Sequence, residues 1–168
     1  MKKRIAIAAI FSLAVIVLMR VQGAGLKTVI TPRGILDLEF ANSPARLTTV
    51  LAAWDQATVT CNIWIDFLFI PAYVLLLSLS VAAVSVNRGK GFLRNTGAWL
   101  ERAAYVAGIL DIAENLLMLQ SIAGNYTPDS LWLTYYCAAI KFAIVCCIML
   151  YLFISLPLIF KKNNPNGA

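Results

Sequence analysis

Three polar side chains interrupt a long apolar stretch at residues 108–119. Asp111, Glu114 and Asn115 are spaced i, i+3 and i+4, and at about 100° per residue these positions share one face of a helix. A carboxylate held at bilayer depth costs roughly 3 kcal/mol on insertion scales, so such groups turn toward a bundle interior and find partners there. This stretch is therefore the first candidate for a functional site.

Two other apolar stretches carry polar groups that we expect at a similar depth. Asp66 and Tyr73 are seven residues apart and share a helical face, and Lys141 lies near the middle of the last apolar stretch. With a rise of about 1.5 Å per residue, Asp111 and Lys141 each lie roughly 15 Å from the outer face of a bilayer, Glu114 roughly 10 Å and Asp66 roughly 3 to 13 Å. These groups are expected to meet in the outer half of one bundle, with Lys141 paired most simply with Asp111.

One lysine and three carboxyl groups do not balance in charge. A single ion pair satisfies Lys141 and leaves two acids that need protons, a cation or a polar ligand. Carboxylate oxygens suit Mg²⁺, Ca²⁺ or Mn²⁺ better than zinc, so the ligands of a metal, if one binds, would be Asp66, Asp111 and Glu114. We predict a site that binds a cation, a proton or a polar lipid headgroup and uses no cofactor, with these candidate residues: Asp66, Tyr73, Asp111, Glu114, Asn115 and Lys141.

Two alternatives remain open at this stage. The same residues would serve an intramembrane lipid-modifying enzyme, with a carboxylate as general base and Lys141 stabilising negative charge. The sequence contains no nucleophile motif, Gly-rich phosphate loop or DGxxAR motif, so binding is preferred over catalysis. In the other alternative the charges only fix helix packing or subunit assembly, and a seam of small residues that includes Ala104 and Gly108 would bring a helix of the same or another chain close.

The composition is that of an integral membrane protein. Of 168 residues, 61% are apolar and 13% are charged, against about 45–50% and 25% in soluble proteins. The net charge of +6 comes from short basic clusters at the ends of apolar runs, which are topology signals and do not indicate nucleic-acid binding. There is no histidine and no CxxC spacing, which argues against a zinc site or a Ser-His-Asp triad.

Four apolar segments predict an all-α integral membrane protein with four transmembrane helices, at about 5–21, 60–86, 98–121 and 131–157, in a single membrane domain. The first segment also resembles a signal peptide with a cut near Gly23, and an uncleaved helix is preferred. The apolar segments predict a protein of the bacterial inner membrane. Basic residues at the start, in the central loop and at the end predict that both termini lie on its cytoplasmic side. Membrane lipid is the expected partner, and the tail at 161–168 is expected to be disordered.

An external amphipathic segment, residues 22–56, is predicted between the first two helices. Ser43 and Pro44 form a helix N-cap followed by proline at the first helical position. Leu47, Val50 and Trp54 then recur at helical spacing. This helix lies either on the membrane surface or on the rim of the bundle, and residues 35–40 are too short to assign by periodicity.

Three sequence elements together resemble a group of small bacterial multi-pass membrane proteins of uncharacterised function. The elements are the run Asp-Phe-Leu-Phe-Ile-Pro-Ala-Tyr at 66–73, the run Gly-Ile-Leu-Asp-Ile-Ala-Glu-Asn at 108–115, and Lys-Phe at 141–142. The similarity covers roughly residues 35–152 and is strongest at the second element. It implies no activity, cofactor or substrate, but it implies that the polar residues of the three elements belong to one pattern.

Overall fold

Four long helices carry most of the chain in the computed structural model, which describes residues 1–86 and 92–162. They are α1 (Lys2–Gln22), α4 (Gln56–Val86), α5 (Phe92–Ile122) and α6 (Pro128–Lys162). Each is long and apolar enough to cross a membrane. The described residues contain no strand, so the predicted all-α, four-helix membrane bundle is confirmed.

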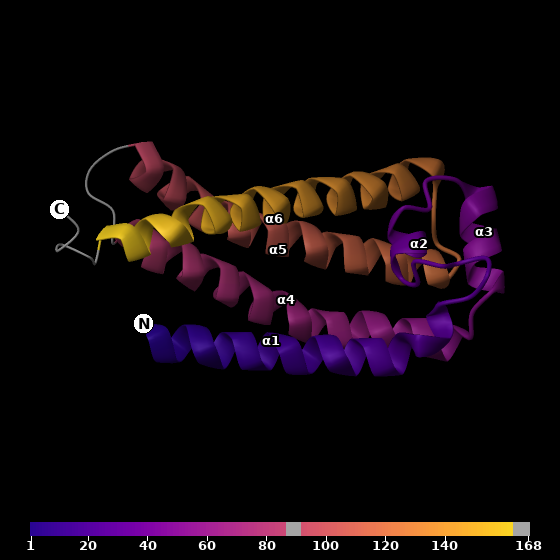
Figure 1. The fold of residues 1–168 in the computed structure, drawn as a ribbon. Helices are drawn as coiled ribbons and strands as arrows, with labels where there is room; N and C mark the ends of the chain where they lie inside the picture. The colour runs from indigo at the N-terminus through magenta and orange to yellow at the C-terminus, as the bar shows by residue number, and fades with distance from the viewer. Residues whose placement is uncertain (87–91, 163–168) are drawn as a thin grey trace.

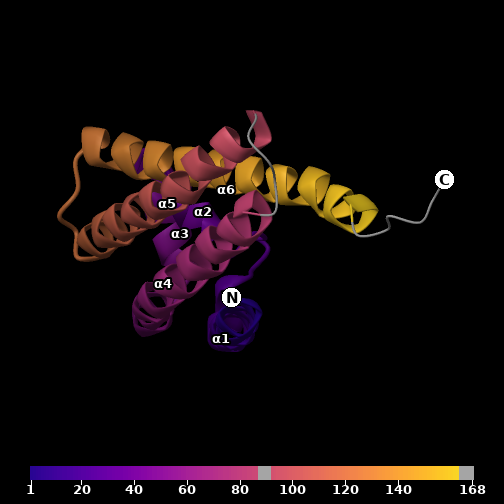
Figure 2. The ribbon, with the colours of Figure 1, turned by 90° about the vertical axis from the view of Figure 1, so that its left-hand side faces the viewer.

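The four helices run up and down in alternation (Figure 1). The start of α1 and the end of α6 lie at one end of the bundle. The other end carries a 3₁₀ turn at Gly23–Leu26 and two short helices, α2 (Leu36–Glu39) and α3 (Pro44–Ala52). We call this end, formed by residues 23–55 and 123–127, the capped end. Helix α5 packs against both α4 and α6, whereas α1 packs mainly on α4 and lies apart from α5 and α6 (Figure 2).

The helices are longer than the predicted spans. Helix α4 begins at Gln56, where the Asp55 carboxylate caps it by accepting hydrogen bonds from the Thr58 backbone N–H and hydroxyl, each 2.9 Å long. These hydrogen bonds lower the pKa of Asp55. Helix α6 continues to Lys162, which corrects the prediction of a disordered tail from residue 161. Lysine is a good helix former, and only the following Asn-Asn-Pro disfavours a helix. Residues 163–168 lie outside the described part of the chain.

Side-chain hydrogen bonds join the end of α1 to α4. The Asn62 side-chain amide donates to the Met19 carbonyl at 3.0 Å and to the Gln22 side-chain oxygen at 2.8 Å. The Gln22 amide in turn donates to the Thr58 carbonyl at 2.9 Å. A Cβ atom at Gly23 would lie 2.6 Å from the Asn62 nitrogen, so a larger residue here would displace the Asn62 amide. The uncleaved first helix stays a prediction, and cleavage near Gly23 would remove these contacts.

The seam of small residues on α5 faces α4 within the same chain. Ala104 is fully buried, and a Cβ atom at Gly108 would lie only 2.7 Å from Val74 Cγ2. Close approach of two transmembrane helices through small residues is a common packing mode. The seam is therefore occupied inside the monomer, and oligomer formation stays a prediction that would have to use another surface.

Helix α3 packs on the end of the bundle. The Ser43 hydroxyl accepts a hydrogen bond from the Arg46 N–H at 3.3 Å, and Pro44 occupies the first helical position, as predicted. Leu47, Val50 and Trp54 are buried in one apolar cluster with residues of α4, α5 and α6: Ile63, Met118 and Leu131. The structure thus shows the rim-packed helix and not one lying freely on a membrane surface.

Replacing Gly108 tests the close contact between α4 and α5. We expect Gly108→Val to lower the stability of the bundle by about 1–3 kcal/mol, the usual cost of overpacking, because the new side chain meets Val74. The measurement is thermal unfolding in detergent by circular dichroism. Val106→Ile on the exposed face of the same helix is the control and should unfold like the wild type. Equal stability of the two variants would contradict the packing described here.

Candidate functional site

Lys141 on α6 lies among three carboxyl groups in the interior of the bundle. Its Nζ atom is 2.6 Å from Asp111 Oδ1, 2.9 Å from Glu114 Oε2 and 3.7 Å from Glu39 Oε2. All four side chains are at most 9% exposed. The predicted pairing of Lys141 with Asp111 is present, and two further acids share the same ammonium group.

Glu39 reaches this position because α2 folds back onto the bundle. The Phe40 ring packs against Tyr135 and Phe142 of α6, with ring centroids 5.4 and 6.1 Å apart. On the other side of α2, the buried Asp37 carboxylate is 2.8 Å from the Arg46 guanidinium and accepts a hydrogen bond from the Arg33 backbone N–H at 2.9 Å. Aromatic packing and this ion pair fix α2, and with it the Glu39 carboxyl, over Lys141.

Three further polar residues lie near this group: Asp66 and Tyr73 on α4, and Asn115 on α5. The Asn115 side-chain amide donates a 2.6 Å hydrogen bond to Asp66 Oδ2. Tyr73, two turns further along α4, points its hydroxyl into the neighbourhood of Asp111. We call Glu39, Asp66, Tyr73, Asp111, Glu114, Asn115 and Lys141 the charge cluster.

A cavity of about 320 Å³ adjoins the charge cluster. Glu39, Asp66, Tyr73, Asp111 and Lys141 form its polar wall. Its other walls are apolar and come from α1, α4 and α6: Met19, Phe69, Leu76, Leu77, Phe142 and Val145. A cavity with one charged wall and several apolar walls suits a ligand that is itself amphiphilic.

Several polar atoms of the charge cluster lack a hydrogen bond from any described residue. They are Glu39 Oε2, Glu114 Oε1 and the Tyr73 hydroxyl. The Glu114 side chain is 0% exposed and Tyr73 is 9% exposed, so bulk water does not satisfy these atoms. Buried polar groups without partners are rare and indicate an additional ligand, proton or water.

The charges in the charge cluster do not cancel. One lysine faces four carboxyl groups, those of Glu39, Asp66, Asp111 and Glu114. Glu39 and Glu114 both approach Lys141 Nζ, at 3.7 and 2.9 Å, so two ionised carboxylates there would repel each other. Burial, the largest effect, raises the pKa of Glu39 above its ordinary value of 4.5. The charge cluster therefore contains more carboxyl groups than its single lysine can neutralise.

All six site residues predicted from the sequence lie in this one region. Glu39 was missed, because a four-residue helix has no periodicity and its partners are remote in sequence. The sequence signal was an acid between Leu38 and Phe40, in a short run that also contains Asp37. Within residues 1–86 and 92–162, no group of three or more His, Cys, Asp or Glu side chains is arranged to hold a metal ion, so the metal ligands Asp66, Asp111 and Glu114 gain no support.

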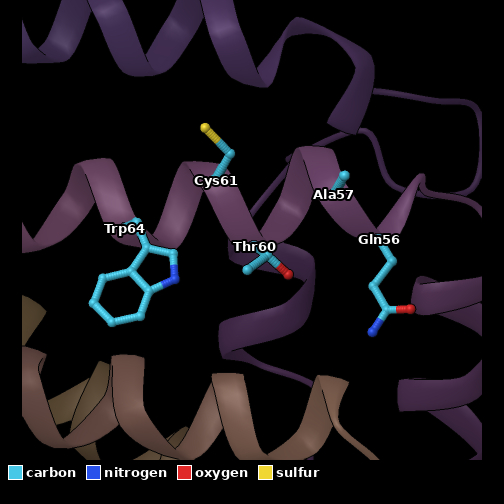
Figure 3. Close-up of a pocket in the computed structure, with 5 residues that line it drawn as sticks. All are labelled: Gln56, Ala57, Thr60, Cys61 and Trp64. Atoms are coloured by element: carbon cyan, nitrogen blue, oxygen red, sulfur yellow. The ribbon is translucent and has the colours of Figure 1, made fainter.

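A larger depression lies on the surface of α4, but it is a poorer candidate. It measures about 700 Å³ and is lined by residues of the first turns of one helix: Gln56, Ala57, Thr60, Cys61 and Trp64 (Figure 3). None of these side chains carries a charge, and Trp64 is 59% exposed. Such a surface lacks the convergent polar groups that usually orient a ligand.

Comparisons with known proteins found no match. No protein-family model matches the chain, and no match was found among the curated proteins or the solved structures.

Removing Lys141 tests whether the ammonium group holds the charge cluster together. We expect Lys141→Met to destabilise the protein by about 3–5 kcal/mol, because it leaves buried carboxyl groups without their cation. Asp111→Asn should cost less, since Glu114 remains 2.9 Å from Lys141. The measurement is denaturant unfolding in detergent micelles.

Combined variants separate one ion pair from a shared network. Asp111→Asn added to Lys141→Met should recover only part of the loss, and Glu114→Gln in addition should recover more. Lys3→Met, an exposed lysine at the start of α1, is the control. Full recovery in the double variant would contradict a network and leave a simple pair.

The raised pKa of Glu39 predicts a pH dependence of stability. Above pH 4.5 the unfolded chain releases the Glu39 proton while the folded chain retains it, so the folded state binds more protons and stability falls as pH rises toward the folded pKa. We expect Glu39→Gln to make this fall shallower in thermal unfolding between pH 4 and 9. Glu101→Gln, at the opposite end of the bundle, should leave the slope unchanged. An unchanged slope in Glu39→Gln would show that Glu39 does not retain its proton.

Proposed function

We propose that this membrane protein binds the cationic or proton-donating headgroup of an amphiphilic ligand at the charge cluster. The observation that carries the proposal is the cavity of about 320 Å³ that is lined both by Glu39, Asp66 and Tyr73 and by apolar side chains. In the absence of a ligand, protons occupy part of the carboxyl groups.

The excess of carboxyl groups over basic groups in the charge cluster favours a positively charged amine over an anion as the ligand. Four carboxyl groups and one lysine attract a positive headgroup, and a buried anion would meet repulsion from Asp66 and Glu39. An ammonium group also donates three hydrogen bonds, and Glu39 Oε2 and the Tyr73 hydroxyl form no hydrogen bond with a described residue.

The apolar walls support a ligand that arrives from the bilayer. Met19 comes from α1, which packs mainly on α4, and Phe142 and Val145 come from α6. A hydrocarbon chain between these helices would bury apolar surface while the headgroup reaches Asp66 and Lys141. Binding therefore needs no water-filled path through the capped end.

The proposed location is a bacterial inner membrane with both termini in the cytoplasm. Support comes from basic clusters at Lys2-Lys3-Arg4, in the loop at 87–94 and at Lys161-Lys162, which the positive-inside rule places on the cytoplasmic side. The start of α1 and the end of α6 lie at the same end of the bundle (Figure 1). Residues 87–91 of the basic loop lie outside the described part of the chain.

A structural role for the charge cluster is the second candidate. Lys141 joins α6 to α5 through Asp111 and to α2 through Glu39, and buried ionic groups can specify one packing arrangement. A role in helix packing alone predicts no ligand. The intramembrane enzyme is a third possibility, and no feature of the site favours catalysis over binding.

A pair of matched probes tests the proposed ligand class. Dodecylammonium and dodecanol have the same chain and differ in headgroup charge, and their binding is measured by native mass spectrometry of the detergent-purified protein. We expect dodecylammonium to bind more tightly, and Asp66→Asn to weaken it about tenfold, the order expected for loss of one charge-assisted contact. Asp129→Asn, an exposed acid at the start of α6, is the control.

Two results would contradict this proposal. Equal binding of the two probes would show that the charge cluster does not recognise a cation. Equal binding of dodecylammonium to wild type, Asp66→Asn and Asp129→Asn would show that the probe binds elsewhere. Either result leaves the structural role as the better account.

A further inference from the structure

A second cavity lies at the capped end between α1, α2 and α4. It measures about 480 Å³, and we call it the basic cavity. Three basic side chains line it, those of Arg20, Lys27 and Arg33. Large apolar side chains, among them Ile16 and Phe69, line it as well. No acidic residue lines it. Its charge is thus opposite to that of the charge cluster.

The positive charge of the basic cavity is only partly neutralised. The Arg33 guanidinium is 3.4 Å from Asp37, and its side chain remains 63% exposed. Arg20 and Lys27 form no ion pair with any acid in the described ranges 1–86 and 92–162. Three cations around one cavity with a single shared acid attract an anionic ligand.

The backbone that carries these basic residues is held in a defined shape. The Thr31 hydroxyl donates to the Leu26 carbonyl at 2.9 Å, and the Trp54 indole N–H donates to the same carbonyl at 2.8 Å. Gly34 adopts a φ of 65°, a left-handed conformation suited to glycine. The loop that separates Lys27 from Arg33 is therefore fixed before a ligand binds, which lowers the entropic cost of binding.

The basic cavity also lies at the end of the candidate membrane span of the first helix, where we expect lipid phosphates. The candidate membrane span of the first helix ends at Leu26, so Arg20 and Lys27 flank the point where the chain leaves the hydrocarbon. Ile16 and Phe69 continue the cavity wall toward the bilayer interior. Basic side chains at a helix end with apolar residues below them match the order of phosphate and acyl chain in a phospholipid.

We propose that the basic cavity binds the anionic phosphate headgroup of a membrane phospholipid through Arg20, Lys27 and Arg33, with an acyl chain against Ile16 and Phe69. This site is separate from the charge cluster, although Met19 and Phe69 line both cavities. The proposal does not depend on the ligand of the charge cluster.

The test compares phospholipid binding in nanodiscs and by native mass spectrometry. The probe is phosphatidylglycerol, with phosphatidylcholine as the neutral comparison. We expect the wild type to retain phosphatidylglycerol preferentially, and Arg20→Gln/Lys27→Gln to bind it about 30-fold less tightly, since each basic side chain near an anionic lipid contributes roughly fivefold. Lys2→Gln/Lys3→Gln removes the same charge from the opposite end of α1 and should retain the wild-type affinity.

A charge-preserving variant, a folding measurement and a competition experiment distinguish the possible outcomes. Arg20→Lys/Lys27→Arg preserves both charges, so it should bind like the wild type, and thermal unfolding shows whether each variant is folded. Equal losses in the two glutamine variants would overturn the proposal, because binding would then follow net charge alone. Displacement of phosphatidylglycerol by millimolar inorganic phosphate would also overturn it, by identifying free phosphate as the ligand. Dodecylammonium binding at the charge cluster should be unchanged in Arg20→Gln/Lys27→Gln, which distinguishes failure of this site from failure of the other.

Discussion

The attraction between one ammonium group and three carboxyl groups organises the interior of this bundle. Lys141 contacts Asp111 and Glu114 on α5 and approaches Glu39 on α2. In an apolar interior each unpaired charge would cost several kcal/mol, so helices that carry these groups must meet at matching depths. The network therefore links α6 to α5 and to α2. The charge cluster also contains more carboxyl groups than ammonium groups, and this excess of acidic groups is its main chemical property.

The capped end is part of the site and not only a connection between helices. Asp37 binds Arg46 on one side of α2, and the Phe40 ring packs on α6 on the other. These contacts hold Glu39 inward, where burial raises the pKa of its carboxyl group. A loop that would otherwise be free to vary is thus coupled to the ionic network, and changes at α3 can reach the charge cluster through Arg46.

Two cavities of opposite charge lie close together beside α1. The cavity at the charge cluster presents four acidic and basic side chains with acids in excess, whereas the basic cavity presents only cations. Both use Met19 and Phe69 as apolar wall. Because α1 packs mainly on α4 (Figure 2), both cavities are bounded by a helix that has few other neighbours. The arrangement places two sets of side chains of opposite charge beside the same apolar residues.

Sequence alone determined the class of fold and most of the cluster. Four apolar stretches of membrane length predict four helices, and the rise per residue places Asp111 and Lys141 at one depth, because helix geometry is local and regular. The tertiary structure decided what depends on contacts between remote segments. It brought Glu39 to Lys141 through a helix too short to show periodicity, directed the Gly108 seam to α4 within the chain, and packed α3 on the rim. It also formed the two cavities, because a cavity is the space that side chains from several helices leave between them, and no single stretch of sequence encodes it.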